Sequence, residues 1–74
     1  MDKMPLGVLK SHIESALKWA SEVSELWTGT LYGDFIDREK SILKGFVETE
    51  EWDKAYDSMI ELIHMCHEAE RAYE

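Results

Sequence analysis

Apolar residues recur every seven positions along the first third of the chain. This spacing places two neighbouring columns of apolar side chains on one face of a helix, the face that packs against other helices. The two columns are Leu6, Ile13, Ala20 and Trp27, and Leu9, Ala16 and Val23. Pro5 suits the first turn of such a helix, and Gly29 suits a left-handed position after its last turn. The pattern therefore predicts a long helix from about residue 5 to 28.

The last third of the chain shows the same repeat with larger side chains. One column is formed by Trp52, Met59, Cys66 and Tyr73, and the second by Tyr56 and Ile63. Thr49 is a suitable N-cap, and acidic residues follow it in the first turn, where the helix dipole favours negative charge. The pattern predicts a second long helix from about 49 to 73, with Trp52, Met59 and Ile63 in the core.

A shorter helix is predicted between these two, from about 34 to 47, with Asp34 as its N-cap. Its apolar residues form two adjacent stripes, the wide face that a helix needs when it is wedged between two others. The stripes are Phe35, Ile42 and Phe46, and Ile36, Leu43 and Val47. The step of six residues from Phe46 to Trp52 does not continue one helical stripe. We therefore expect a break at about 48–49.

The predicted fold is all-α, a single domain over residues 1–74 built as a small antiparallel bundle of three helices (long, short, long). A core in a chain of 74 residues rarely supplies more than about 3–5 kcal/mol. The single cysteine, Cys66, excludes an intramolecular disulfide as an additional source of stability. We expect oligomerisation, most simply as a homodimer, to complete the bundle.

Negative charge is concentrated at one end of the chain. Residues 49–74 contain eight acidic and two basic residues, so they carry −6 of the net charge of −8. Phosphate binding depends on Lys and Arg, so this balance argues against direct binding of nucleic acid and against anionic membrane surfaces. It favours a protein partner with a basic surface. Glu50, Asp57, Glu61 and Glu68 fall along one stripe of the last helix, interrupted only by Lys54 and His64, and we expect this stripe to govern partner choice.

Three features of the sequence bear on the cellular location of the protein. No apolar run approaches the roughly 20 residues of a membrane span, and the N-terminus lacks the pattern of a signal peptide. The lone cysteine fits a reducing compartment. We therefore expect a cytoplasmic protein.

Candidate chemistry is limited to one step on the last helix. Glu61 and His64 form an E-x-x-H pair, which di-iron bundles use twice together with further carboxylates. The helical phase turns both side chains outward, and Cys66 and His64 diverge by about 200° around the helix. Nucleophile motifs and Gly-rich phosphate loops are lacking. We expect no catalytic residues, no metal site and no cofactor, with Cys66 acting as a small hydrophobe.

Surplus apolar surface favours a binding role. Trp19 and Leu26 lie seven residues apart on a second stripe of the first helix, and Met65 is an apolar residue on the polar side of the last one. Tryptophan is enriched among the residues that dominate protein interfaces. The predicted interface is Trp19, Leu26, Asp57, Glu61, Met65 and Glu68.

The predicted function is that of a small acidic, non-catalytic interaction module that acts through helix–helix contacts as a homo-oligomer. Two alternatives remain open at this point. One is a phage-type inhibitor that blocks a basic, nucleic-acid-binding groove by charge mimicry. The other is a metal-binding helical bundle, in which oligomerisation would supply a second copy of the E-x-x-H step.

Overall fold

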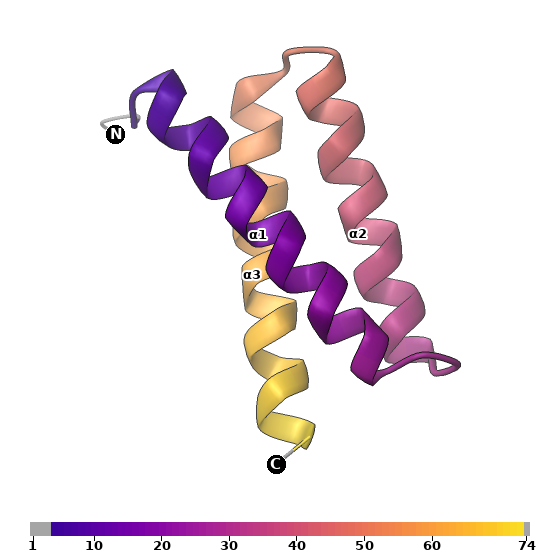
Figure 1. Cartoon of the computed structure of the whole chain (residues 1–74). Coiled ribbons are helices and arrows are strands. Elements are labelled where there is room, and N and C mark those ends of the chain that lie inside the picture. The colour runs from indigo at the N-terminus through magenta and orange to yellow at the C-terminus, as the bar shows by residue number, and fades with distance from the viewer. Residues whose placement is uncertain (1–3, 74) are drawn as a thin grey trace.

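The protein is an all-α bundle of three helices. The computed structural model describes residues 4–73, with only the backbone of residue 73, and it contains no β-strand in this range. The helices are α1 (Leu6–Leu26), α2 (Leu31–Glu48) and α3 (Trp52–Tyr73), and each contacts the other two. The chain reverses after α2, so that α3 runs back beside it, while α1 crosses in front of both (Figure 1).

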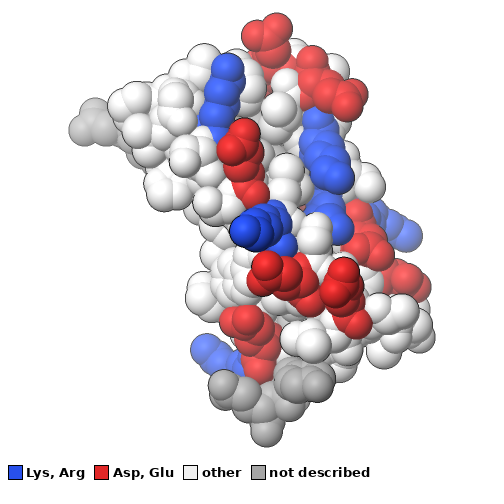
Figure 2. Space-filling view, viewed as in Figure 1, with Lys and Arg blue, Asp and Glu red and all other residues white. Residues whose placement is uncertain are grey.

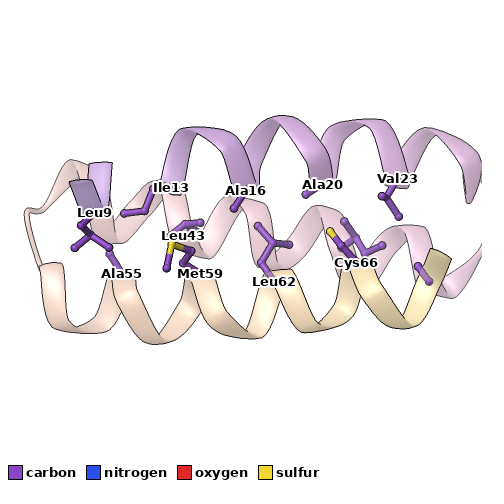
Figure 3. Packing of buried hydrophobic residues seen from close by; sticks show 12 residues of the cluster. Leu9, Ile13, Ala16, Ala20, Val23, Leu43, Ala55, Met59, Leu62 and Cys66 are labelled. Carbon is purple, nitrogen blue, oxygen red and sulfur yellow. The ribbon is translucent and has the colours of Figure 1, made fainter. Parts of the chain in front are cut away.

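The core follows the predicted columns of α1 closely. Its buried side chains come from both columns, and they are Leu9, Ile13, Ala16, Ala20 and Val23. Figure 3 shows them directed towards α3, with Ala16 and Ala20 on the side of the core opposite Leu62 and Cys66. Alanine at these two positions leaves room for the larger side chains. At the ends of its column, Leu6 remains 45% exposed and Trp27 is half-buried.

The predicted seam of α3 is half correct. Met59 and Cys66 are buried as expected, but the second buried column lies three residues after them and four before them, whereas the predicted column lies four after and three before. This second column is Ala55, Leu62 and Ala69. The expectation that Trp52 and Ile63 are core residues is wrong, because both are half-buried at the edge, as is Tyr56. The side chain of Tyr73, also assigned to the seam, lies outside the described residues.

The start of α2 differs from the prediction. The helix begins at Leu31 and its N-cap is Thr30, whose Oγ1 accepts a hydrogen bond from the Gly33 N–H (3.1 Å) and donates one to the Trp27 carbonyl (2.6 Å). Asp34 therefore lies in the first turn. A Cβ at Gly33 would overlap the Trp27 carbonyl, so glycine allows α2 to start this close to the end of α1.

The break between α2 and α3 lies where the phase predicted it, but it is built differently. Thr49 is the C-cap of α2, not the N-cap of α3, and Glu50 adopts a left-handed conformation with φ 57°. The Glu50 N–H donates to the Val47 carbonyl (3.1 Å), and the Glu51 N–H to the Phe46 carbonyl (2.9 Å). This is a Schellman motif with glutamate at the position that glycine usually occupies. Consequently α3 begins only at Trp52.

Candidate protein interface

An apolar stripe on α2 faces solvent. Leu31 is 74% exposed, Phe35 50% and Ile42 39%, and their spacing of four and seven residues places them on one side of the helix. Phe46, half-buried, extends the same side by one further turn. We call these four residues the outer stripe. The ammonium of Lys54 on α3 lies 6.0 Å from the centre of the Phe46 ring, so the outer stripe runs beside α3.

The second apolar stripe of α2 forms part of the core. Ile36 and Leu43 follow Phe35 and Ile42 directly in sequence, and both are completely buried. A step of one residue turns the side chain by about 100°, which separates the two stripes. The expectation that α2 is covered on its whole wide face is therefore wrong. In the chain alone, α1 and α3 cover the inner stripe and, at one end of the outer stripe, part of Phe46.

An acidic column on α3 runs along the border with α2. Lys54, Glu61 and Glu68 are spaced by seven residues and so share one flank of the helix. Lys54 contacts Phe46 at one end. At the other end, Tyr32 of α2 lies near Glu68: burial, and then this negative charge, raise the pKa of the tyrosine. Asp57, Glu61 and Glu68 are all exposed, and we call these three residues the acidic column.

Trp19 has a partner within the molecule. Its indole N–H donates to the Glu70 carboxylate (3.0 Å), and its ring meets His67 edge-on with centres 4.8 Å apart. The side chain is half-buried and packs against the core. Much of the apolar surface that seemed surplus in the sequence is thus used in packing α1 against α3.

The six residues of the predicted interface do not form one surface. Glu70 and His67, which contact Trp19, lie on the flank of α3 opposite to Glu61 and Glu68. Leu26 is 53% exposed at the last residue of α1, and Met65 is half-buried against the core. Met65 thus lies on the same helix as the acidic column, whereas Trp19 lies against the other flank of that helix.

Sequence reasoning missed Leu31, Phe35 and Ile42 as surface residues. The signal was present, because a short helix with two apolar stripes needs neighbours on both. The other two helices, α1 and α3, also pack against each other, and together they cover mainly one of the two stripes.

On α3, the side chains of His64 and Glu68 form a pair of possible metal ligands. The imidazole Nε2 of His64 lies 3.5 Å from the Glu68 carboxylate, and both side chains are exposed. Within residues 4–73, no group of three His, Cys, Asp or Glu side chains is close enough to share a metal ion. Burial, and then Glu70, raise the pKa of the Cys66 thiol to about 11, against a smaller opposing effect of Lys40. Cys66 is thus a buried, protonated side chain at neutral pH.

A groove of about 280 Å³ lies between α1 and α2, at the end where α3 begins. Its apolar lining is Ile13, Leu17, Val47 and Trp52, and its charged lining is Lys10, Glu14, Lys44 and Glu48. The Lys10 ammonium sits 5.3 Å from the centre of the Trp52 ring. Basic and acidic side chains are interleaved on the face formed by α1 and α2 (Figure 2). Because these charges balance, the groove does not select a ligand of one sign.

Comparisons with known proteins add no assignment. No protein-family model matches this chain, and none of the curated proteins or solved structures is significantly similar to it. Across the described residues, no helix is both long enough and apolar enough to cross a membrane.

Proposed function

We propose that this protein is a non-catalytic interaction module that binds other helices through the outer stripe of α2. The observation that carries the proposal is the exposure of Leu31, Phe35 and Ile42 in one row. Isolated apolar side chains are common on protein surfaces, whereas a contiguous row is typical of an interaction site. An amphipathic helix laid along α2 would cover such a row with anchors at matching helical spacing.

The acidic column gives this surface its selectivity. Asp57, Glu61 and Glu68 border the outer stripe, so a partner helix needs basic or neutral residues on the edge that faces α3. Complementary charge of this kind acts mainly on the association rate and on the choice of partner. A basic protein surface is therefore the partner we propose for the exposed carboxylates, and the outer stripe supplies the apolar contact.

A second candidate function follows from the acidic column alone. Three exposed carboxylates along one helix, in a chain of net charge −8, could occupy a basic groove that normally receives nucleic acid. This inhibitor role needs the carboxylates and not the apolar stripe. The two candidates thus differ in which residues matter.

The test compares two matched substitutions. Phe35→Ser removes an apolar side chain (50% exposed) from the outer stripe, and Ile60→Ser removes a similarly exposed apolar side chain (47%) from the outer side of α3. Each variant, immobilised beside the parent, is exposed to an extract of the native host, and the bound proteins are quantified by mass spectrometry. We expect Phe35→Ser to lose bound proteins that Ile60→Ser and the parent retain.

The same experiment separates the second candidate. A double reversal, Asp57→Lys with Glu61→Lys, should abolish binding completely if the protein is a charge mimic, while Phe35→Ser should leave it intact. If neither the stripe variant nor the double reversal changes the bound set or the self-association of the chain, both candidates are wrong.

A further inference from the structure

The border between α2 and α3 has a regular register. At one end the Lys54 ammonium stands beside the Phe46 ring, and at the other end Glu68 lies near Tyr32. Phe46 and Tyr32 are 14 residues apart on α2, and Lys54 and Glu68 are also 14 residues apart on α3, so both helices advance by about four turns between the two ends. The residues between the ends therefore face one another in matching order.

An apolar pair bridges the two helices within this border. Three residues inward from the Glu68 end, Phe35 of α2 lies opposite Met65 of α3. Phe35 is 50% exposed, and Met65 is half-buried against the core. The apolar surface of the outer stripe thus extends across the border onto α3. A helix laid along the border would contact α2 and α3 together.

Two carboxylates meet at the centre of the same border. Seven residues inward from either end, Glu39 of α2 lies opposite Glu61 of α3. Glu39 is half-buried and Glu61 exposed, and neither forms an ion pair with any residue that the structure describes. The exposed Phe35 and Ile42 flank this acidic pair on α2, so a helix that covers them also removes water from between the carboxylates and strengthens their repulsion. A cation brought by that helix would offset the repulsion.

We propose that the occupant of this border is a basic amphipathic helix of another protein. It places an apolar side chain on Phe35 and Met65, and an Arg or Lys between Glu39 and Glu61. Because Phe35 and Glu39 are one turn apart, the partner carries its apolar and its basic residue three or four positions apart on one face. This inference rests on the proposed function, because it names the partner of the same surface.

Charge favours such a partner over a second copy of this chain. A two-fold pair of copies centred on the border would bring Glu39 and Glu61 of each copy together, so four carboxylates would meet at the axis. Like charges that meet in an interface disfavour association, whereas a basic helix is complementary to the same centre.

Two designed peptides test the acidic pair. Each is as long as α2 (18 residues) and has Leu at the first and fourth positions of every heptad. One peptide has Arg at the fifth position and the other has Gln, and the remaining positions are Ala and Gln in both. Fluorescence anisotropy of each labelled peptide, titrated with the full chain, measures the affinity. We expect the Arg peptide to bind about tenfold more tightly, as for a charge-assisted hydrogen bond.

Matched variants of the protein locate the effect. Glu39→Gln with Glu61→Gln removes the acidic pair at nearly constant side-chain size, and it should bring the two peptides to similar affinity. Glu22→Gln with Glu25→Gln removes the same charge from exposed positions of α1 and should preserve the preference for Arg. Circular dichroism checks that each variant keeps its helix content. The inference is overturned if the Arg peptide does not bind, if the parent does not prefer it, or if the two double variants respond alike.

The apolar pair has a test of its own. Met65→Gln keeps the length of the side chain but makes its end polar, so it should weaken both peptides by a similar factor. Ile60→Gln makes the corresponding change on the outer side of α3, where the residue is 47% exposed, and should leave both affinities unchanged. If Met65→Gln binds both peptides as the parent does, the helix contacts α2 alone and the inference is wrong.

Failure here is distinguishable from failure of the proposed function. If Phe35→Ser weakens both peptides while the acidic pair and Met65 have no effect, the outer stripe binds helices of another class, and only this inference is wrong. If Phe35→Ser changes neither peptide binding nor the proteins captured from the host extract, the interaction role of the stripe itself is wrong. Sedimentation velocity covers the remaining occupant: self-association of the parent that the Arg peptide does not displace would make a second copy the partner and overturn the inference.

Discussion

The two apolar stripes of α2 differ in how far they are buried. Ile36 and Leu43 are completely buried, whereas Phe35 and Ile42, their immediate neighbours in sequence, are 50% and 39% exposed. The residue types are equivalent, so hydrophobicity alone does not decide which stripe enters the core. The decision comes from the number of helices available to cover α2. Burial stabilises the fold by about 25 cal/mol for each Å² of apolar surface, so the inner stripe contributes more to folding than the outer stripe, which is the surface we propose for binding.

The sharpest test of this difference is a pair of adjacent truncations. Leu43→Ala removes a fully buried side chain and should cost about 2–5 kcal/mol, enough to unfold a large fraction of so small a protein. Ile42→Ala should cost about 0.5 kcal/mol or less. Urea titrations followed by circular dichroism, at protein concentrations below any association, measure both. Equal losses at the two positions would mean that the outer stripe is part of the folding core.

The start of α2 should be nearly as sensitive as its inner stripe. A methyl group at Gly33 overlaps the Trp27 carbonyl, so Gly33→Ala should destabilise the protein by about 1–3 kcal/mol. Gly45→Ala is the matched control, because a Cβ there meets nothing within 4 Å. It should stabilise α2 by about 0.5–1 kcal/mol through helix propensity. Thermal melts of both variants check the prediction, which fails if the two melting temperatures shift in the same direction.

The other end of α2 should gain stability from a single change. Glu50 holds a positive φ that L-residues adopt at a cost, so Glu50→Gly should stabilise the protein by about 1 kcal/mol. Glu51→Gly, one residue later and without a positive φ, removes a carboxylate that accepts a hydrogen bond from the Thr49 hydroxyl (2.6 Å) and pairs with Lys54 (3.0 Å), so it should lower stability. Chemical denaturation of both variants decides the matter. If both variants changed the free energy of unfolding equally, the effect would come from charge rather than from the left-handed backbone at Glu50.

The smallest expected effect concerns Ser58, the one polar side chain that is buried among the described residues. The Ser58 hydroxyl is buried and forms no hydrogen bond to any described residue. Ser58→Ala should therefore stabilise the fold by about 0.5–1 kcal/mol, through relief of this unpaired group and the higher helix propensity of alanine. Its melting temperature is the measurement. A lower melting temperature would indicate that the hydroxyl has a bonding partner in solution.

The sequence predicted the helices better than it predicted their contacts. The columns of α1 were correct because large and small apolar residues alternate with polar ones in a single unbroken register. In α3 two registers compete, and the larger side chains of Tyr56 and Ile63 suggested the wrong one. The buried register instead uses Ala55 and Ala69, whose small size allows close approach of the helices but gives little signal in sequence.

The candidate interface was predictable only in part. The acidic column follows from spacing along one helix, so Asp57, Glu61 and Glu68 were identified correctly as exposed neighbours on one flank. The contact of Trp19 with Glu70 was not predicted, because Glu70 lies 51 residues away and no local pattern reports such a contact. Phe35, Ile42 and Phe46 were predicted to lie on a covered face, since the sequence does not show how much of α2 its neighbours cover, and Leu31 fell before the predicted start of the helix.

The single thiol, that of Cys66, makes it possible to measure how often the folded chain opens. Cys66 has no exposed surface and, with a pKa of about 11, holds almost no thiolate in the folded state at pH 8. An alkylating reagent can therefore react with Cys66 only after α3 has opened, so the labelling rate reports how often this opening occurs. Because the folded state favours the neutral thiol, this contribution to stability is present below the ordinary thiol pKa and is lost as the pH rises through 11. A labelling rate that falls as the protein is concentrated would indicate that self-association stabilises the closed state.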